Sequence, residues 1–315
     1  ITDLLEPEKD NYLVIRVEDI TTDLTQPRGK QYWKEQSEGI FYTPSSGIWQ
    51  TVWLEPVHRL HLTQLQFTPD IQQGAVILAA KTSHPTQAEL QVEITFAGET
   101  VTSTTLALKD GQLKAAVALG ERHLWSPETP HLYDITLRLV IDGQVCDQVQ
   151  SYFGLREMAI KDGRILLNGQ PYLMKLVLDQ GYFPGGLLTP PTDSAIQLDV
   201  ELTKAMGFNG VRKHQKVEDP RYLYWADRMG LLVWGEMANG YSFSATAVSR
   251  LMAEWQAVIE RDYNHPCIVA WVPLNESWGV PELGGDLRQV NFLLALYHQT
   301  KALDATRLVM ANDGW

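Results

Sequence analysis

The sequence predicts a multidomain protein in which β domains precede an α/β domain, and three observations support this fold class. The chain has 315 residues, about twice the size at which one hydrophobic core usually suffices. Short alternating strands fill its first half, whereas strands alternate with helices in its second half. We therefore expect three domains, at residues 1–58, 59–153 and 154–315.

The first domain reads as strands separated by one long loop. "ITDLLEPEKDNYLVIRV" (1–17) predicts a strand hairpin, because its apolar residues alternate at the period of a strand. "GIWQTVWLEPV" (47–57) repeats that pattern. The stretch "TQPRGKQYWKEQSEGIFYTPSSG" between them is polar and rich in Gly and Pro, so we expect a loop there.

The second domain predicts a β-sandwich, because short strands follow one another across turns that contain Gly. Asp142-Gly143 lies between two alternating runs and is a strong hairpin signal. The expected strands are "LHLTQLQFTPD", "AVILAAKTS", "AELQVEITFAGE", "QLKAAVAL" and "LYDITLRLVIDGQVCDQVQSYFG".

The third domain predicts part of a (β/α)8 barrel, because strands that alternate with helices require a parallel sheet buried on both faces. A closed barrel takes about 250 residues, so we expect an incomplete TIM barrel with its remaining strands beyond Trp315. No Gly-rich phosphate loop follows the first strand, which disfavours a nucleotide-binding fold. The expected strands are "YLMKLVLD", "FNGVRKH", "LLVWGEM", "CIVAWVPLNES" and "RLVMAND", and the expected helices are 193–207, 219–230, 246–263 and 286–303. The first helix is expected to group Ile196, Leu198, Leu202, Ala205 and Met206 on one side.

The composition argues against several classes of partner. A net charge of −12 disfavours nucleic acid and anionic membrane surfaces, and no apolar run approaches the roughly 20 residues of a membrane helix. Two cysteines, Cys146 and Cys267, are too few for a disulfide framework or a zinc site. We expect no cofactor and no metal, and the sequence assigns no compartment.

The expected carboxyl ends of the barrel strands carry polar side chains, where the functional groups of such barrels sit. Carboxylates, amides and an arginine without a metal-ligand pattern suit a neutral substrate with many hydroxyl groups. Ten Trp and twelve Tyr add faces that can stack on sugars, although most of them should pack in cores. The residues at these strand ends are Asp179, Arg212, His214, Glu236, Asn275, Glu276, Asn312 and Asp313.

Glu276 is the strongest catalytic candidate. Next to Trp278 at the mouth of an apolar strand it would be partly desolvated, as a general acid working near neutral pH requires. The adjacent Asn275 has an amide that can donate to a sugar hydroxyl. The alternative for Glu276 is a salt bridge or a helix cap.

The other candidates keep open alternatives. Arg212 either holds a nucleophilic carboxylate ionised or forms a structural ion pair with a carboxylate such as Glu236. His214 is either an acid/base or a hydrogen-bonded residue at a strand end, and Glu236 leans to a structural role. Asp179, before the loop "QGYFPGG", either binds a substrate hydroxyl or caps a turn.

Several long motifs resemble glycoside hydrolase family 2, the family of β-galactosidases, β-glucuronidases and β-mannosidases. "SGIWQTVWLEPV" resembles the segment that closes the family's sugar-binding jelly roll, and residues 59–153 resemble its immunoglobulin-like sandwich. "FGLREMAIKDGRILLNGQPYLMKLV", "MGFNGVRKHQKVEDPRYLYWADRMGLLVWGE" and "RDYNHPCIVAWVPLNES" are similar to the entry, the second-to-third strand signature and the acid/base signature of its barrel.

This resemblance implies a retaining exo-β-glycosidase with Glu276 as general acid/base. Asn275 would bind the 2-hydroxyl of the sugar, Arg212 would support the nucleophile, and Asp179, His214 and Trp278 would line the substrate site. Such enzymes use two carboxyl groups about 5 to 5.5 Å apart. The family nucleophile is a Glu on the seventh strand, so we expect it beyond Trp315 and expect residues 1–315 alone to be inactive.

The sequence departs from the family pattern at several positions. "RKHQKVEDP" places its His one residue earlier than usual, so the usual role is not transferred to His214. "LDQGYFPGG" replaces a His-rich segment of many β-galactosidases, and "GEMANGYSF" does not fit the magnesium ligands of some relatives. Two alternatives therefore stay open: a non-catalytic carbohydrate-binding protein with a vestigial barrel, and an unrelated hydrolase that pairs Asp179 with Glu276. An open barrel also predicts either a longer protein or self-association into a homo-oligomer.

Overall fold

The computed structural model describes residues 2–6 and 8–314, and its amino-terminal segment differs from expectation. A short 3-10 helix, η1 (Thr2–Leu4), is followed by an extended trace up to residue 61, without a strand in the part described. The predicted strands within residues 1–17 and 47–57 are therefore wrong. Their alternation is real, but no neighbouring strand pairs with them, and Tyr12 and Trp53 are 87% and 70% exposed.

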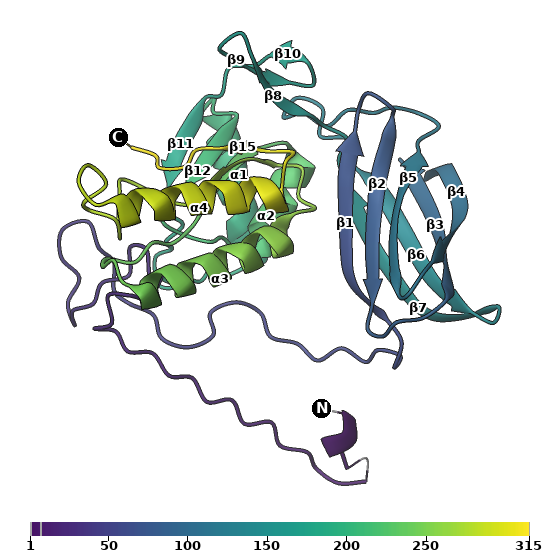
Figure 1. The fold of residues 1–315 in the computed structure, drawn as a ribbon, viewed down its shortest axis with the longest axis horizontal. Coiled ribbons are helices and arrows are strands. Elements are labelled where there is room, and N and C mark those ends of the chain that lie inside the picture. The colour runs from purple at the N-terminus through teal and green to yellow at the C-terminus, as the bar shows by residue number, and fades with distance from the viewer. Residues whose placement is uncertain (1, 7, 315) are drawn as a thin grey trace.

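Two antiparallel sheets pack face to face in the next part of the chain (Figure 1). One sheet has the order β1–β2–β5 and the other has the order β4–β3–β6–β7. Apolar side chains that alternate along the strands of both sheets form one shared core. The strands are β1 (Leu62–Asp70), β2 (Ala75–Thr82), β3 (Ala88–Phe96), β4 (Glu99–Leu108), β5 (Gln112–Ala118), β6 (Tyr133–Ile141) and β7 (Gln144–Phe153).

The turn between β6 and β7 confirms the predicted hairpin. Asp142 and Gly143 have φ of 50° and 77°, the left-handed pair that a tight two-residue turn requires. Sequence reasoning missed β4, because its Thr- and Ser-rich sequence is polar and it lies at the edge of its sheet. A small sheet of β8 (Met158–Lys161), β9 (Arg164–Leu167) and β10 (Gln170–Pro171) follows the sandwich.

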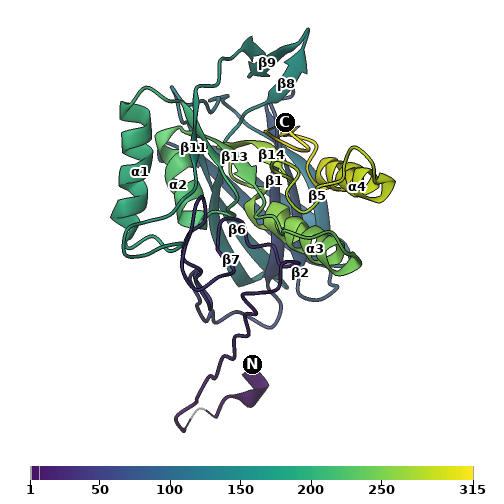
Figure 2. The ribbon, with the colours of Figure 1, turned by 90° about the vertical axis from the view of Figure 1, so that its left-hand side faces the viewer.

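The carboxy-terminal half forms the predicted parallel sheet, with neighbours in chain order from β11 to β15. Four helices lie outside the curved sheet, from α1 on one side to α4 on the other (Figure 2). This arrangement fits part of a (β/α)8 barrel. The strands are β11 (Leu176–Asp179), β12 (Gly210–Lys213), β13 (Leu232–Glu236), β14 (Ile268–Val272) and β15 (Leu308–Val309), and the helices are α1 (Asp193–Ala205), α2 (Pro220–Met229), α3 (Ala245–Asp262) and α4 (Leu287–Leu303).

The buried face of α1 differs from the predicted one. Ile196, Val200 and Thr203 are buried, whereas Leu198 and Leu202 are each 50% exposed. The predicted apolar side is therefore wrong, because α1 packs on α2 and the sheet through another face, and no described element covers its leucines. Strands β11 and β15 are the two edges of this sheet.

Part of the amino-terminal segment folds against the carboxyl ends of the barrel strands. The Asp23 carboxylate pairs with Arg250 at the start of α3, at 2.6 Å, and the amide of Tyr241 donates to the carbonyl of Leu24. Tyr42 stacks on Tyr182, with ring centroids 3.9 Å apart. We call residues 23–50 the strap, since they cross this end of the barrel.

Candidate active site

Arg212 is the centre of a polar cluster at the carboxyl ends of β12 to β15. Its guanidinium contacts the Glu236 carboxylate at 2.7 Å and the Asp313 carboxylate at 2.6 Å. It also donates to the side-chain oxygen of Asn275. Arg212 thus forms the ion pair with Glu236 that one alternative expected, and its side chain also faces inward, as the other alternative required. One planar cation therefore holds groups from the end of β13 and from the segments that follow β14 and β15.

Glu236 is almost fully buried beside this arginine. Its second carboxylate oxygen accepts a hydrogen bond from the backbone amide of Gln215 at 2.7 Å. Burial raises the pKa of Glu236 to about 7, against the opposing effect of Arg212. This carboxyl group therefore titrates near neutral pH inside the cluster.

Backbone geometry after β14 presents Asn275 and Glu276. The amide of Asn275 donates to the Asn239 side chain at 2.8 Å, and the amide of Glu276 donates to the carbonyl of Asp313 at 2.6 Å. Glu276 and Ser277 both have left-handed backbones, with φ of 49° and 58°. Non-glycine residues adopt this region rarely, and such conformations concentrate at functional sites. The turn holds the half-buried Glu276 side chain against Gly314.

Two buried nitrogens of this cluster lack a hydrogen-bond partner within the described part of the chain: Asn275 Nδ2 and His214 Nδ1. Burial lowers the pKa of His214 to about 4, and the positive charges of Arg212 and Lys30 act in the same direction. His214 is therefore neutral at physiological pH. A buried polar nitrogen without a partner is costly in a folded protein, so these two nitrogens mark positions where a ligand could bond.

An aromatic wall borders Glu276. Trp278 lies 5.1 Å from Tyr241 and 6.1 Å from Phe41, measured between ring centroids, and Trp33 of the strap packs on Tyr241 at 4.9 Å. The Lys30 ammonium lies 4.9 Å from the centroid of Trp278. Sequence reasoning included Trp278 and missed the strap residues, because nothing in a polar loop 240 residues upstream signals this contact.

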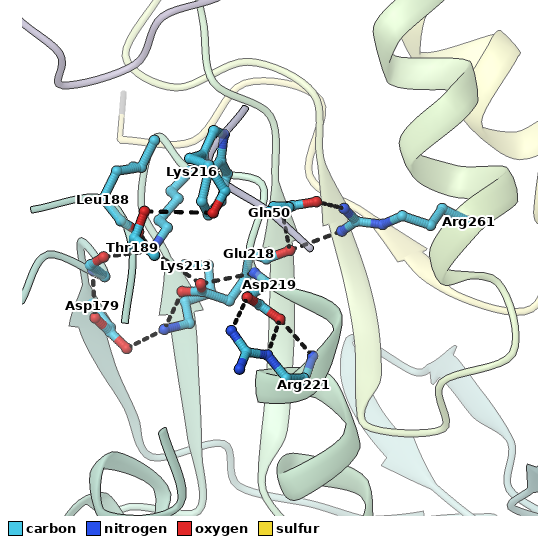
Figure 3. A network of polar contacts seen from close by, with 12 residues as sticks. Gln50, Asp179, Leu188, Thr189, Lys213, Lys216, Glu218, Asp219, Arg221 and Arg261 are labelled. Carbon is cyan, nitrogen blue, oxygen red and sulfur yellow. Dashed lines mark hydrogen bonds and ion pairs between the residues drawn. The ribbon is translucent and has the colours of Figure 1, made fainter. Parts of the chain in front are cut away.

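Asp179 lies outside the cluster. It pairs with Lys213 at 2.5 Å, and one of its oxygens accepts the amide of Gly181 at 2.8 Å (Figure 3). Of the two alternatives for this residue, the turn-capping one fits, and the substrate-binding one finds no support in its position. The proposed carboxylate pair of Asp179 with Glu276 finds none either, since Asp179 faces an ion-pair network on the other side of the sheet.

That network joins three loops (Figure 3). Lys213 contacts Glu218 at 2.8 Å, and Lys216 contacts the other oxygen of Glu218 at 3.0 Å. Gln50 of the strap accepts a bond from Arg261 at 3.0 Å. The lysines and Glu218 are buried, whereas the Asp179 side chain is 24% exposed, and the network supports the loops around the site.

Within residues 2–6 and 8–314, no three or more His, Cys, Asp or Glu side chains gather as a metal site would require. Over the same residues, no helix is both long enough and apolar enough to cross a membrane.

Two family models match the chain. The model of glycosyl hydrolases family 2 matches residues 60–156, and the model of the TIM barrel domain of that family matches residues 158–314. A protein of Formosa agariphila named as a candidate β-glucuronidase is 30% identical over 83% of this chain and 33% of its own length. A β-galactosidase of Thermoanaerobacter pseudethanolicus is 25% identical over 76% of this chain and 34% of its own length.

Solved structures share the fold. The β-glucuronidase of Parabacteroides merdae aligns with a TM-score of 0.70 at 21% identity, over 79% of this chain and 33% of that one. A family 2 glycosyl hydrolase of Bacteroides cellulosilyticus aligns with a TM-score of 0.71 at 22% identity, over 84% of this chain and 37% of that one. The chain spans about a third of the length of the curated relatives it matches. With both of its folded parts matched by models of one family, the chain belongs to glycosyl hydrolase family 2.

Proposed function

We propose that this chain is part of a retaining exo-β-glycosidase that hydrolyses terminal β-glycosides. The observation that carries the proposal is the turn at Asn275 and Glu276, which holds a half-buried carboxyl group beside an unpaired amide and an aromatic wall. The carboxyl group can protonate a glycosidic oxygen. The amide can bind a sugar hydroxyl, and the aromatic face can stack on the sugar ring. The names of relatives, β-glucuronidase and β-galactosidase, agree with this reaction class.

In the proposed mechanism Glu276 acts first as an acid and then as a base. Its carboxyl proton goes to the glycosidic oxygen as the bond to the leaving group breaks, while a second carboxylate attacks the anomeric carbon. The resulting glycosyl-enzyme is hydrolysed when Glu276 takes a proton from the attacking water. Asn275 Nδ2 would donate to the 2-hydroxyl of the sugar.

We propose that the nucleophile lies outside residues 1–315, on a later barrel strand. Arg212 would keep that carboxylate ionised while it holds Glu236 and Asp313 in place. We also propose that residues 1–58 are the end of a jelly-roll domain, that 59–153 form an immunoglobulin-like domain, and that 154–315 begin the barrel domain.

The stereochemistry of the product tests the proposal. Full-length protein would be incubated with 4-nitrophenyl β-glycosides, and the first-formed anomer would be followed by proton NMR. We expect the β-anomer to appear first, because two displacements retain the configuration. An α-anomer formed first, or turnover by residues 1–315 alone that Glu276→Gln abolishes, would contradict the proposal.

A further inference from the structure

Lys30 brings a positive charge from the strap into the candidate site. Its residue is only 4% exposed, and its ammonium forms neither a hydrogen bond nor an ion pair with any other described group. Burial lowers the pKa of Lys30, whereas the negative charges of Glu276 and Glu236 raise it. Lys30 therefore lies in the same electrostatic environment as the proposed proton donor.

The backbone around Lys30 is built to reach this position. The amides of Arg28 and Gly29 both donate to the carbonyl of Asn239, at 3.2 and 3.1 Å, and the Tyr241 hydroxyl donates to the carbonyl of Gly29. Gly29 has φ of +58°, and a Cβ atom there would lie 1.9 Å from the carbonyl oxygen of Gln215. Only a glycine allows the strap to approach the β12 loop this closely.

The position of the ammonium limits what it can do. The ammonium lies over the Trp278 ring and has no oxygen partner among the described groups, so its N–H donors are free to bond a ligand. Asn275 Nδ2 and His214 Nδ1, the two unpaired nitrogens described above, belong to the same cluster. A sugar bound there would offer oxygen acceptors to Lys30 while its apolar face met an aromatic ring.

We propose that Lys30 is a substrate-binding residue whose ammonium donates hydrogen bonds to an oxygen of the sugar in this site. This inference rests on the proposed function and assigns a specificity role to the strap. The oxygen can belong to a hydroxyl group of a neutral glycoside or to the carboxylate of a glycuronide. A carboxylate would form a charged pair with Lys30, so the two sources predict different substrate preferences.

The experiment compares Lys30→Met with wild-type full-length protein on the 4-nitrophenyl β-D-glucuronide, β-D-galactoside, β-D-glucoside and β-D-mannoside. Methionine keeps the packing of the stem on Trp278 and removes the charge, so a purely packing role predicts no change. We expect kcat/KM on the best substrate to fall about 10- to 100-fold. Lys34→Met is the matched control, since Lys34 lies in the same strap and its side chain is 61% exposed.

The pattern over the four sugars identifies the oxygen. A similar loss on all of them indicates a hydroxyl group, whereas a loss confined to the glucuronide indicates its carboxylate. A Lys30→Met protein that folds and keeps kcat/KM within about twofold on every substrate overturns the inference. If Lys30→Met does not fold, Lys30→Arg tests the inference instead, because the bulkier planar guanidinium cannot occupy the position of the ammonium. Unchanged kcat/KM in Lys30→Arg would also overturn the inference.

Failure of the proposed function would look different. It would appear as no hydrolysis of any of the four substrates by wild-type protein, or as full activity in Glu276→Gln. In that event calorimetric titration of wild type and Lys30→Met with D-glucuronate and D-galactose still tests Lys30. Weaker binding to the variant would support a sugar contact, and equal binding or no binding by both proteins would overturn it.

Discussion

Arg212 and Lys213 are adjacent in β12, yet they belong to two different ion clusters. Arg212 faces the inside of the curved sheet, where its partners are Glu236 and Asp313, and the side chains of Arg212 and Asp313 remain 14% and 22% exposed. Lys213 faces the helix side, where its partners are Asp179 and Glu218. Its side chain is 2% exposed and lies over the ring of Tyr222.

The two clusters differ in how their nitrogen atoms are paired. The inner cluster contains nitrogens without partners, from Asn275 and His214, next to the half-buried Glu276. In the outer cluster the Lys213 and Lys216 ammonium groups contact carboxylates, and Lys216 also donates to the carbonyl of Leu188 at 3.1 Å. Charge content alone therefore does not separate the two clusters, whereas the half-buried carboxyl group of Glu276 beside the inner one does.

The largest expected effect is on stability, from Lys213→Met. Removal of the ammonium leaves the buried carboxylate of Glu218 and the 24% exposed carboxylate of Asp179 without their shared partner. Breaking a buried ion pair in this way costs about 3–5 kcal/mol. Urea denaturation of the full-length protein would measure it, with the exposed Lys175→Met as control, expected within about 0.5 kcal/mol of wild type. A loss as small as that of the control would contradict a supporting role for the outer cluster.

The next effect is a pH dependence that belongs to the inner cluster. Glu236 has a pKa near 7 in the folded protein and an ordinary value of 4.5. Because the folded state holds this proton more tightly, its contribution is fully present below pH 4.5 and is lost as pH rises through about 7. The free energy of unfolding of wild type, relative to Glu236→Gln, is expected to fall by at most about 1.4 kcal/mol per pH unit in this window. Parallel pH profiles for the two proteins would exclude a raised pKa at Glu236.

The smallest expected effect is that of Arg212→Lys. Lysine keeps the charge but cannot hold Glu236, Asp313 and Asn275 with one planar group. We expect kcat/KM of the full-length protein to fall about tenfold, a change of about 1.4 kcal/mol, with most of it in kcat. Urea denaturation of the same variant controls for stability. Unchanged kinetics would mean that the inner cluster, like the outer one, only supports the fold.

The sequence predicted the barrel elements well because each one carries its own signals. Asp219 caps α2 ahead of Pro220, and β14 is buried along its whole length, as a parallel strand between helices should be. The same local logic was wrong at residues 47–57, where a strand-like alternation has no partner strand, and at α1, where Leu198 lies on an uncovered face. Local patterns report what a segment can form, whereas pairing and coverage depend on distant segments.

The residues of the candidate site also fall into two groups, those that local sequence patterns could predict and those that they could not. Arg212, Asn275, Glu276 and Trp278 were predictable, because strand ends in a parallel sheet meet at one edge. Lys30 was not predictable from the sequence. Its position depends on the strap, which is held by backbone hydrogen bonds to Asn239 and by the close approach of Gly29 to Gln215. Asp179 shares the edge but faces the helices, a difference of one residue in strand register that sequence alone left open.

Glu276→Ala in the full-length protein tests the central claim most directly. With 4-methylumbelliferyl or alkyl glycosides, whose leaving groups need a proton, kcat/KM is expected to fall about 10²- to 10⁴-fold. With 2,4-dinitrophenyl glycosides, which leave without one, formation of the glycosyl-enzyme should stay fast, and azide should restore turnover by replacing the water that Glu276 activates. Equal losses on both kinds of substrate, or no loss on either, would contradict Glu276 as the acid/base.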